Sequence, residues 1–151
     1  MNISRFTDYS LRVLIYLAIN KNTNEIKTIK EIAECYGVSK NHLMKVVQQL
    51  SAQGYINSTR GKNGGIKLNH AAEQINIGKL VRSFEGKSAL VECFGENNFC
   101  IITPACQLKK VLSHAIESFF NCLDQYTLAD LINGPNKAVL SKILITPTMH
   151  D

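Results

Sequence analysis

Three cysteines that lie close together provide the clearest chemistry in this chain of 151 residues. Cys93, Cys100 and Cys106 follow a C-x6-C-x5-C spacing in one predicted loop that ends where a long helix begins. Thiols that converge from a single loop can hold a soft centre such as zinc, copper(I) or an iron–sulfur cluster. The spacing is wider than the C-x2-C pairs typical of structural zinc sites, so redox-active or buried thiols are equal alternatives.

A long amphipathic helix is expected directly after this loop, which runs over residues 89–102. Thr103 fits the N-cap and Pro104 fits the first helical position, where its missing N–H is not needed. Cys106 would then lie in the first turn, where the helix dipole favours a thiolate over a thiol. The helix would thus activate one of the three thiols.

Apolar residues recur along this helix at spacings of three and four for about six turns, as far as Tyr126. The stripe is wider than one small domain needs, so part of it is expected to pack on a second copy around a two-fold axis. Core packing within one chain is the alternative. The predicted dimer contacts are Leu108, Val111, Leu112, Ala115, Phe119 and Leu123.

The charge of the chain is unevenly distributed. Residues 1–70 have 10 Lys and Arg against 4 Asp and Glu, whereas residues 71–151 have 7 against 8, and the formal net charge is +5. No acidic residue occurs between Glu34 and Glu73. Such a basic segment suits a polyanionic partner, and an ordinary solvated basic face is the alternative.

Three helices are predicted in the basic first half of the chain. Helical spacing of apolar residues predicts a first helix over 7–21, with Thr7 or Asp8 as its N-cap. A second helix of about two turns starts after Thr28 and stops at Gly37. The tight glycine turn connects it to a third helix, capped by the serine two residues later.

The third helix and the segment after it complete a known DNA-binding arrangement. The polar residues Asn41, Lys45 and Gln48 lie opposite the apolar side of the third helix. The pattern then changes to period two on both sides of a glycine-rich turn at 61–65, which predicts a β-hairpin. Two helices joined by a tight turn and followed by a hairpin form a winged helix-turn-helix.

In that arrangement the third helix enters the major groove of DNA and the hairpin is the wing. Arg60 would enter a narrow, strongly negative minor groove, with Lys62 and backbone N–H groups on phosphates. The residues predicted to contact DNA are Ser39, Lys40, Asn41, His42, Lys45, Gln48, Arg60, Lys62, Asn63 and Gly64.

The predicted fold class is mostly α-helical with one small β-hairpin. A winged helix-turn-helix domain is expected over 1–75, and the cysteine loop and dimerisation helix over 76–145. Residues 146–151 are expected to form a flexible tail. Shorter helices are predicted over 77–84 and 127–132.

Several function classes are disfavoured by the sequence. The apolar stretch 13–20 is too short to cross a bilayer and Asp8 is unsuited to a signal peptide, so we expect a cytoplasmic protein with no membrane partner. The glycine-rich turn lacks phosphate-loop spacing and the four histidines have no triad partners, so no enzyme is expected. An electron carrier or thiol oxidoreductase is disfavoured, because such a protein would need a C-x-x-C pair and this chain has none.

A winged-helix regulator whose thiols sense oxidation or a metabolite without a cluster is the main alternative. Cys35 and Cys122 are interpreted as small hydrophobic residues.

Four motifs occur together: Phe6-Thr7-Asp8-Tyr9, Tyr36-Gly37-Val38-Ser39-Lys40-Asn41-His42, Arg60-Gly61-Lys62-Asn63-Gly64-Gly65 and Ile102-Thr103-Pro104-Ala105-Cys106. With them the chain resembles the nitric-oxide-sensitive repressors of a bacterial winged-helix family that also contains the iron–sulfur regulator IscR. The resemblance covers about residues 1–145, and the wing motif and the three-cysteine loop are specific when taken together.

The resemblance implies a homodimer that binds palindromic, double-stranded promoter DNA and responds to nitric oxide. It implies an iron–sulfur cluster, 4Fe-4S in preference to 2Fe-2S, on Cys93, Cys100 and Cys106. In similar members the fourth ligand is an aspartate of the other subunit near the start of the first helix, and Asp8 occupies that place. An IscR-like chain would have a histidine where this chain has Lys109, which favours the nitric oxide sensor.

Overall fold

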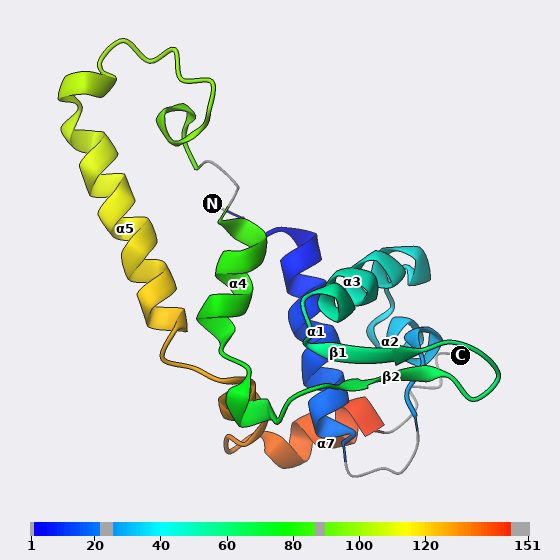
Figure 1. The fold of residues 1–151 in the computed structure, drawn as a ribbon. Coiled ribbons are helices and arrows are strands. Elements are labelled where there is room, and N and C mark those ends of the chain that lie inside the picture. Colours follow the sequence, from blue (N-terminus) through cyan, green and yellow to red (C-terminus); the bar gives the residue numbers. More distant parts are fainter. Residues whose placement is uncertain (1, 22–25, 87–89, 146–151) are drawn as a thin grey trace.

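The computed structural model describes residues 2–21, 26–86 and 90–145. It has a helical body, a two-stranded hairpin at one side and a long helix that stands away from the body (Figure 1). The helices are α1 (Arg5–Ile19), α2 (Ile29–Tyr36), α3 (Lys40–Ala52), α4 (Ile77–Glu85), α5 (Gln107–Leu123), α6 (Leu128–Ile132) and α7 (Lys137–Ile145). The strands are β1 (Ile56–Thr59) and β2 (Gly65–Leu68), and short 3-10 turns lie at Ala72–Gln74, Glu92–Phe94 and Thr103–Ala105. This architecture confirms the predicted, mostly α-helical fold with one small hairpin.

Helix α1 is the centre of the body. It contacts α3, α4, α6, α7 and β2, and Val13 and Leu14 are fully buried on it. The helix begins directly after Ser4, whose hydroxyl accepts the N–H of Thr7 and caps the first turn. The predicted N-cap, Thr7 or Asp8, is therefore wrong, because Ser4 provides an equivalent cap one turn earlier.

The helix-turn-helix forms as the sequence predicted. A capping box starts α2: the Thr28 hydroxyl accepts the N–H of Glu31, and the Glu31 carboxylate accepts the N–H of Thr28. Gly37 ends the helix at φ 62°, a left-handed conformation that costs glycine little. Helix α3 follows at once, with Ser39 as an N-cap whose backbone is extended.

The hairpin pairs β1 and β2 in antiparallel register, with Ile56 opposite Leu68. Ile56 and Ile66 are buried, and the hairpin contacts α3 through β1 and α1 through β2. The N–H of Ile66 also donates to the carbonyl of Lys27 at 2.7 Å, which ties the segment before α2 to the second strand. The hairpin is thus fixed at its base to α3, to α1 and to the segment before α2.

Helix α5 begins later than predicted. Residues Thr103–Ala105 form a separate 3-10 turn, and the extended backbone of Cys106 (φ −76°, ψ 112°) interrupts the helix there. Cys106 is the N-cap of α5, and its Sγ accepts the N–H of Lys109 at 3.4 Å. Thr103 is therefore not the N-cap, and Cys106 precedes the first turn instead of lying within it. The helix also ends at Leu123, earlier than predicted.

The C-terminal part contains one helix that the sequence did not predict. Helix α6 forms where expected, with a capping box between Thr127 and Asp130. After Gly134 and Pro135, where no further helix was predicted, the chain forms α7. Helix α7 packs on α1, with Leu144 buried and Leu140 partly buried. The predicted tail, 146–151, lies outside the described residues.

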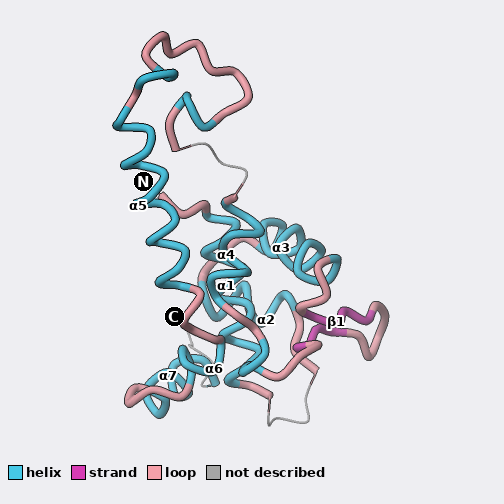
Figure 2. The backbone as a smooth tube through the Cα atoms, turned by 60° about the vertical axis from the view of Figure 1, so that its left-hand side comes forward, coloured by secondary structure: helices cyan, strands magenta, loops and turns pink. Residues whose placement is uncertain are grey.

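The position of α5 gives the molecule its extended shape. Figures 1 and 2 show α5 beside α4, with the loop of the three cysteines at the far end of α5. Helix α3 and the hairpin lie on the other side of α1. None of the helices in the described ranges is long and apolar enough to cross a membrane.

Gly78→Ala tests how closely α4 approaches the end of α5. A Cβ at Gly78 would lie 2.0 Å from Asp124 Oδ1 and 2.5 Å from the backbone N of Asp124. Because backbone would have to move, we expect urea denaturation to show a loss of about 1–3 kcal/mol in the free energy of unfolding. Gly134→Ala is the control, since nothing lies within 4 Å of its Cβ. Equal losses in the two variants would contradict this close approach.

Candidate nucleic-acid interface and thiol loop

The residues predicted to contact DNA lie on the outer face of α3 and at the tip of the hairpin. Helix α3 buries its apolar side, Leu43, Val46, Val47 and Leu50. Its other side is exposed, together with three residues of the hairpin tip: Ser39, Lys40, Asn41, His42, Lys45, Gln48, Arg60, Lys62 and Asn63. Gly64 is partly buried at that tip. Since the sequence has no acidic residue between Glu34 and Glu73, α3 and the hairpin form a continuous basic and polar surface.

Asp8 lies at the start of α1 and is held by Arg12. The guanidinium donates from Nε to Asp8 Oδ1 at 3.1 Å and from Nη2 to Oδ2 at 2.8 Å, and 44% of the Asp8 side chain is exposed. The Arg12 Cζ lies 5.7 Å from the ring centre of Tyr9 and 5.8 Å from that of Tyr36. Arg12 therefore connects Asp8 to the last residue of α2.

A second contact links the start of α1 to α3. The rings of Tyr9 and His42 have their centres 6.1 Å apart, and His42 lies in the first turn of α3. The hydroxyl of Tyr36 also donates to the carbonyl of Arg12 at 3.0 Å, and burial raises the pKa of Tyr36 well above its usual range. The surroundings of Asp8 are thus built from the same residues that fix α2 and α3.

Glu85, at the end of α4, has a structural role that the sequence did not reveal. Its Oε1 accepts hydrogen bonds from the Ser4 N–H at 2.9 Å, the Ser4 hydroxyl at 2.6 Å and the Thr7 hydroxyl. Partial burial opposes ionisation, but these hydrogen bonds outweigh it and lower the pKa of Glu85 below its ordinary value of 4.5. Glu85 thereby fastens the end of α4 to the beginning of α1.

The three cysteines share one loop but are not assembled into a site. Cys93 lies in the turn Glu92–Phe94, Cys100 in the following loop and Cys106 at the N-cap of α5. All three are free and partly buried. Across the residues that the structure describes, no group of three His, Cys, Asp or Glu side chains lies close enough to hold a metal ion. The donor set suits a soft metal centre, whereas its present arrangement does not enclose one.

The cysteines outside the loop differ from each other. Cys35 is partly buried on α2, and burial raises the pKa of its thiol, as expected of a small hydrophobic residue. Cys122 is exposed on α5, so its interpretation as a packed hydrophobic residue is wrong. The helical spacing that placed Cys122 near apolar residues did not reveal which of them face the body.

The predicted dimer stripe on α5 divides into two parts. Near the body, Phe119 and Leu123 pack against the core and Leu112 is partly buried. Toward the cysteine loop, 61% of Leu108 and 62% of Val111 are exposed, and Ala115 is exposed as well. The chain's own body therefore covers only the C-terminal half of the stripe.

An arginine fastens the base of α5 to α4. Arg82 donates from Nη2 to Asp124 Oδ2 at 2.7 Å and from Nη1 to Glu117 Oε1 at 3.3 Å. Its Cζ lies 4.5 Å from the ring centre of Phe120, which is buried. Hydrogen bonding to Asp124 is the largest cause of a raised Arg82 pKa. Since Glu85 lies one turn further along the same helix and binds Ser4 and Thr7, the last turn of α4 connects α5 to the beginning of α1.

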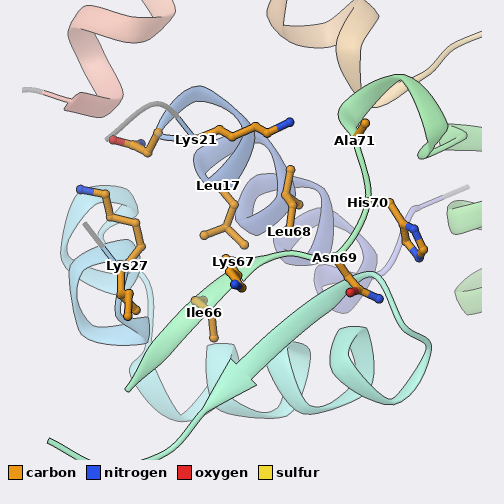
Figure 3. A pocket seen from close by; sticks show the side chains of 11 residues that line it. Leu17, Lys21, Lys27, Ile66, Lys67, Leu68, Asn69, His70 and Ala71 are labelled. Carbon is orange, nitrogen blue, oxygen red and sulfur yellow. The ribbon is translucent and has the colours of Figure 1, made fainter. Parts of the chain in front are cut away.

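A cavity of about 510 Å³ lies between the end of α1 and the second strand. Figure 3 shows its lining, in which Leu17, Ile66 and Leu68 are accompanied by three lysines. The amino groups of Lys21 and Lys27 point in different directions in this view. The lysines therefore do not converge on a single anion, and the cavity is a cleft beside the wing.

Comparison with known proteins identifies the family to which this arrangement belongs. A family model described as Rrf2, iron-dependent transcriptional regulator, matches residues 3–134. The chain belongs to the Rrf2 family. It is 54% identical over 133 residues to the HTH-type transcriptional regulator NsrR of Bacillus licheniformis, across 87% of this chain and 92% of that protein. Identity to the HTH-type transcriptional regulator NsrR of Bacillus subtilis is 48% over 145 residues, across 95% and 97%.

A solved structure of the same family has the same fold. IscR of T. potens aligns with a TM-score of 0.67 and 26% identity, over 88% of this chain and 87% of that one. The family confirms the resemblance inferred from the four motifs, and it confirms that the chain is a transcriptional regulator and not an enzyme. The exposed face of α3 and the hairpin are accordingly surface elements of an Rrf2 transcriptional regulator.

Glu85→Gln tests the connection between α4 and α1. Because the pKa of Glu85 is lowered in the folded protein, its ionised form stabilises the fold above the ordinary value of 4.5, and this stability is lost as the pH falls through the lowered pKa. We expect wild type to exceed the variant in free energy of unfolding at neutral pH and to approach it as the pH falls well below 4.5. Denaturation at several pH values measures this, and a difference independent of pH would contradict it.

Proposed function

We propose that this chain is an iron–sulfur-dependent repressor that binds palindromic promoter DNA as a homodimer and responds to nitric oxide. The observation that supports it best is the presence of three free thiols in one loop, at the start of α5, in a member of a family described as iron-dependent. The relatives named NsrR share about half of its residues. A reducing, cytoplasmic location follows for a protein that needs free thiols.

Cys93, Cys100 and Cys106 would hold the cluster as thiolates, and Asp8 of the partner subunit would complete the ligand set. When bound, a 4Fe-4S cluster would supply iron that reacts with nitric oxide, with 2Fe-2S as the alternative form. Asp8 is a harder ligand than the thiolates and is held less firmly by iron. Within its own chain Asp8 pairs with Arg12, so ligation and the Arg12 pair compete for one carboxylate.

This competition would connect the ligand set to DNA reading. Arg12 lies against Tyr36 at the end of α2, and Tyr9 lies against His42 on α3. If Asp8 left Arg12 to bind iron, the contacts that position α2 and α3 would therefore change. The polar face of α3 would read the major groove and Arg60 the minor groove, in half-sites about one helical turn or a multiple of it apart.

A regulator that senses oxidation through its thiols, without a cluster, is the second candidate. It is favoured by one observation, namely that the three partly buried thiols are free and not gathered into a metal site among the described residues. Such a protein would contain no iron, and its DNA affinity would change on treatment with peroxide. Iron and sulfide analysis of anaerobically purified protein separates the two functions.

Val111→Glu tests the proposed dimer. Val111 is exposed in the single chain, so a charge there leaves the fold of the subunit intact but would be buried in a seam formed by two α5 helices. We expect sedimentation at micromolar concentration to give monomers, with wild type as dimers. Ser113→Glu, on the other side of α5, is the matched control and should remain dimeric. A dimeric Val111→Glu protein would place the subunit contact elsewhere.

Alanine substitutions of the loop cysteines test the cluster. Cys93→Ala, Cys100→Ala and Cys106→Ala should each abolish bound iron, because each removes one of only three thiolates. Asp8→Ala should keep some iron in a more labile form, since water can replace a carboxylate. Cys122→Ala is the control and should match wild type in iron and sulfide content. Loop variants that hold as much iron as wild type would disprove the proposed ligand set.

A further inference from the structure

The exposed face of α3 contains one large apolar side chain that the core does not use. Met44 is 50% exposed, whereas the apolar side of the helix is already complete with four fully or almost fully buried residues, Leu43, Val46, Val47 and Leu50. Its neighbours on the outer surface are polar. Asn41 is one turn before Met44 and Gln48 is one turn after it, and both are exposed. Met44 therefore lies in the middle of the exposed surface of α3 that is proposed to face DNA.

A second subunit does not account for this exposure. The exposed apolar part of α5 and helix α3 lie on opposite sides of α1 (Figures 1 and 2). A dimer formed through α5 would leave Met44 uncovered. The hairpin contacts α3 through β1, and Met44 is half exposed with the hairpin in place.

We propose that Met44 determines part of the DNA sequence preference by apolar contact with the C5-methyl group of a thymine in each half-site. This inference rests on the proposed entry of α3 into the major groove. Among the bases of ordinary DNA only thymine presents a methyl group there. The unbranched thioether of methionine adapts to such a surface without needing a hydrogen-bond partner. Asn41 and Gln48 on either side would read the polar base edges.

Replacement of thymine by uracil measures this contact, because uracil differs from thymine in the major groove only by the absent methyl group. The DNA is a duplex that wild-type protein enriches from a random-sequence library. Each thymine pair related by the palindrome is changed to uracil in turn, and the dissociation constant is measured for wild type and Met44→Ala. Burial of one methyl group corresponds to about a fourfold change in affinity.

We expect one thymine pair at which uracil weakens wild-type binding about fourfold for each half-site, whereas Met44→Ala binds the thymine and uracil duplexes equally. Such non-additivity isolates the contact between the two groups. Gln49→Ala, exposed on the same helix, is the matched control and should keep the full uracil penalty. Met44→Gln should keep the fold, as judged by thermal unfolding, and lose the penalty.

The outcomes separate this inference from the proposed function. If wild type enriches a duplex but Met44→Ala and Met44→Gln stay as sensitive to uracil as wild type, Met44 does not read thymine, although α3 can still bind DNA. A wild-type protein that shows no uracil penalty at any thymine pair also overturns the assignment. If wild type enriches no duplex at all, the proposed DNA-binding function fails, and the role of Met44 fails with it.

Discussion

The burial of α1 is the constraint on which the rest of the structure depends. Val13 and Leu14 are fully buried where α3, α4, α6, α7 and β2 meet this helix. Burial of one such side chain contributes about 1.5–3 kcal/mol, a large share of the marginal stability of a small domain. The same helix presents Asp8 and Arg12 near its beginning. Because α3 contacts α1 directly and α5 is joined to α1 through α4, the beginning of α1 is the natural place for one region to influence the other.

The two functional regions lie on opposite sides of this helix and differ in character. Helix α3 and the hairpin form the basic side, while α5 extends the thiol loop away from the body (Figure 1). Helix α4 connects them: Arg82 binds the base of α5, and Glu85 binds Ser4 and Thr7. Coupling between the regions therefore has a physical route through polar contacts in the last turn of α4.

Local signals in the sequence were sufficient for the DNA-reading unit. The Thr28 capping box, Gly37 and the glycine-rich turn each specify their own backbone, so α2, α3 and the hairpin follow from neighbouring residues alone. The start of α5 was missed because the Cys106 thiol caps the helix after a Thr-Pro turn that resembles a helix start. Helix α7 was missed because it depends on contact with α1, which is distant in sequence.

The candidate site was predictable in its residue types and not in its contacts. Spacing identified the three thiols, and the family resemblance singled out Asp8. Neither could reveal that Asp8 pairs with Arg12, that Glu85 binds Ser4 and Thr7 at the beginning of α1, or that only half of the α5 stripe is open. These facts depend on how α1, α4 and α5 pack together, which no local pattern encodes.

The affinity of iron-loaded wild-type protein for its selected DNA duplex, measured anaerobically before and after addition of nitric oxide, tests the central claim most directly. The account predicts a lower affinity after nitric oxide, and by linkage the duplex should disfavour the nitric-oxide-treated form by the same factor. An iron-loaded protein whose affinity for DNA is unchanged by nitric oxide and by removal of the iron would contradict it.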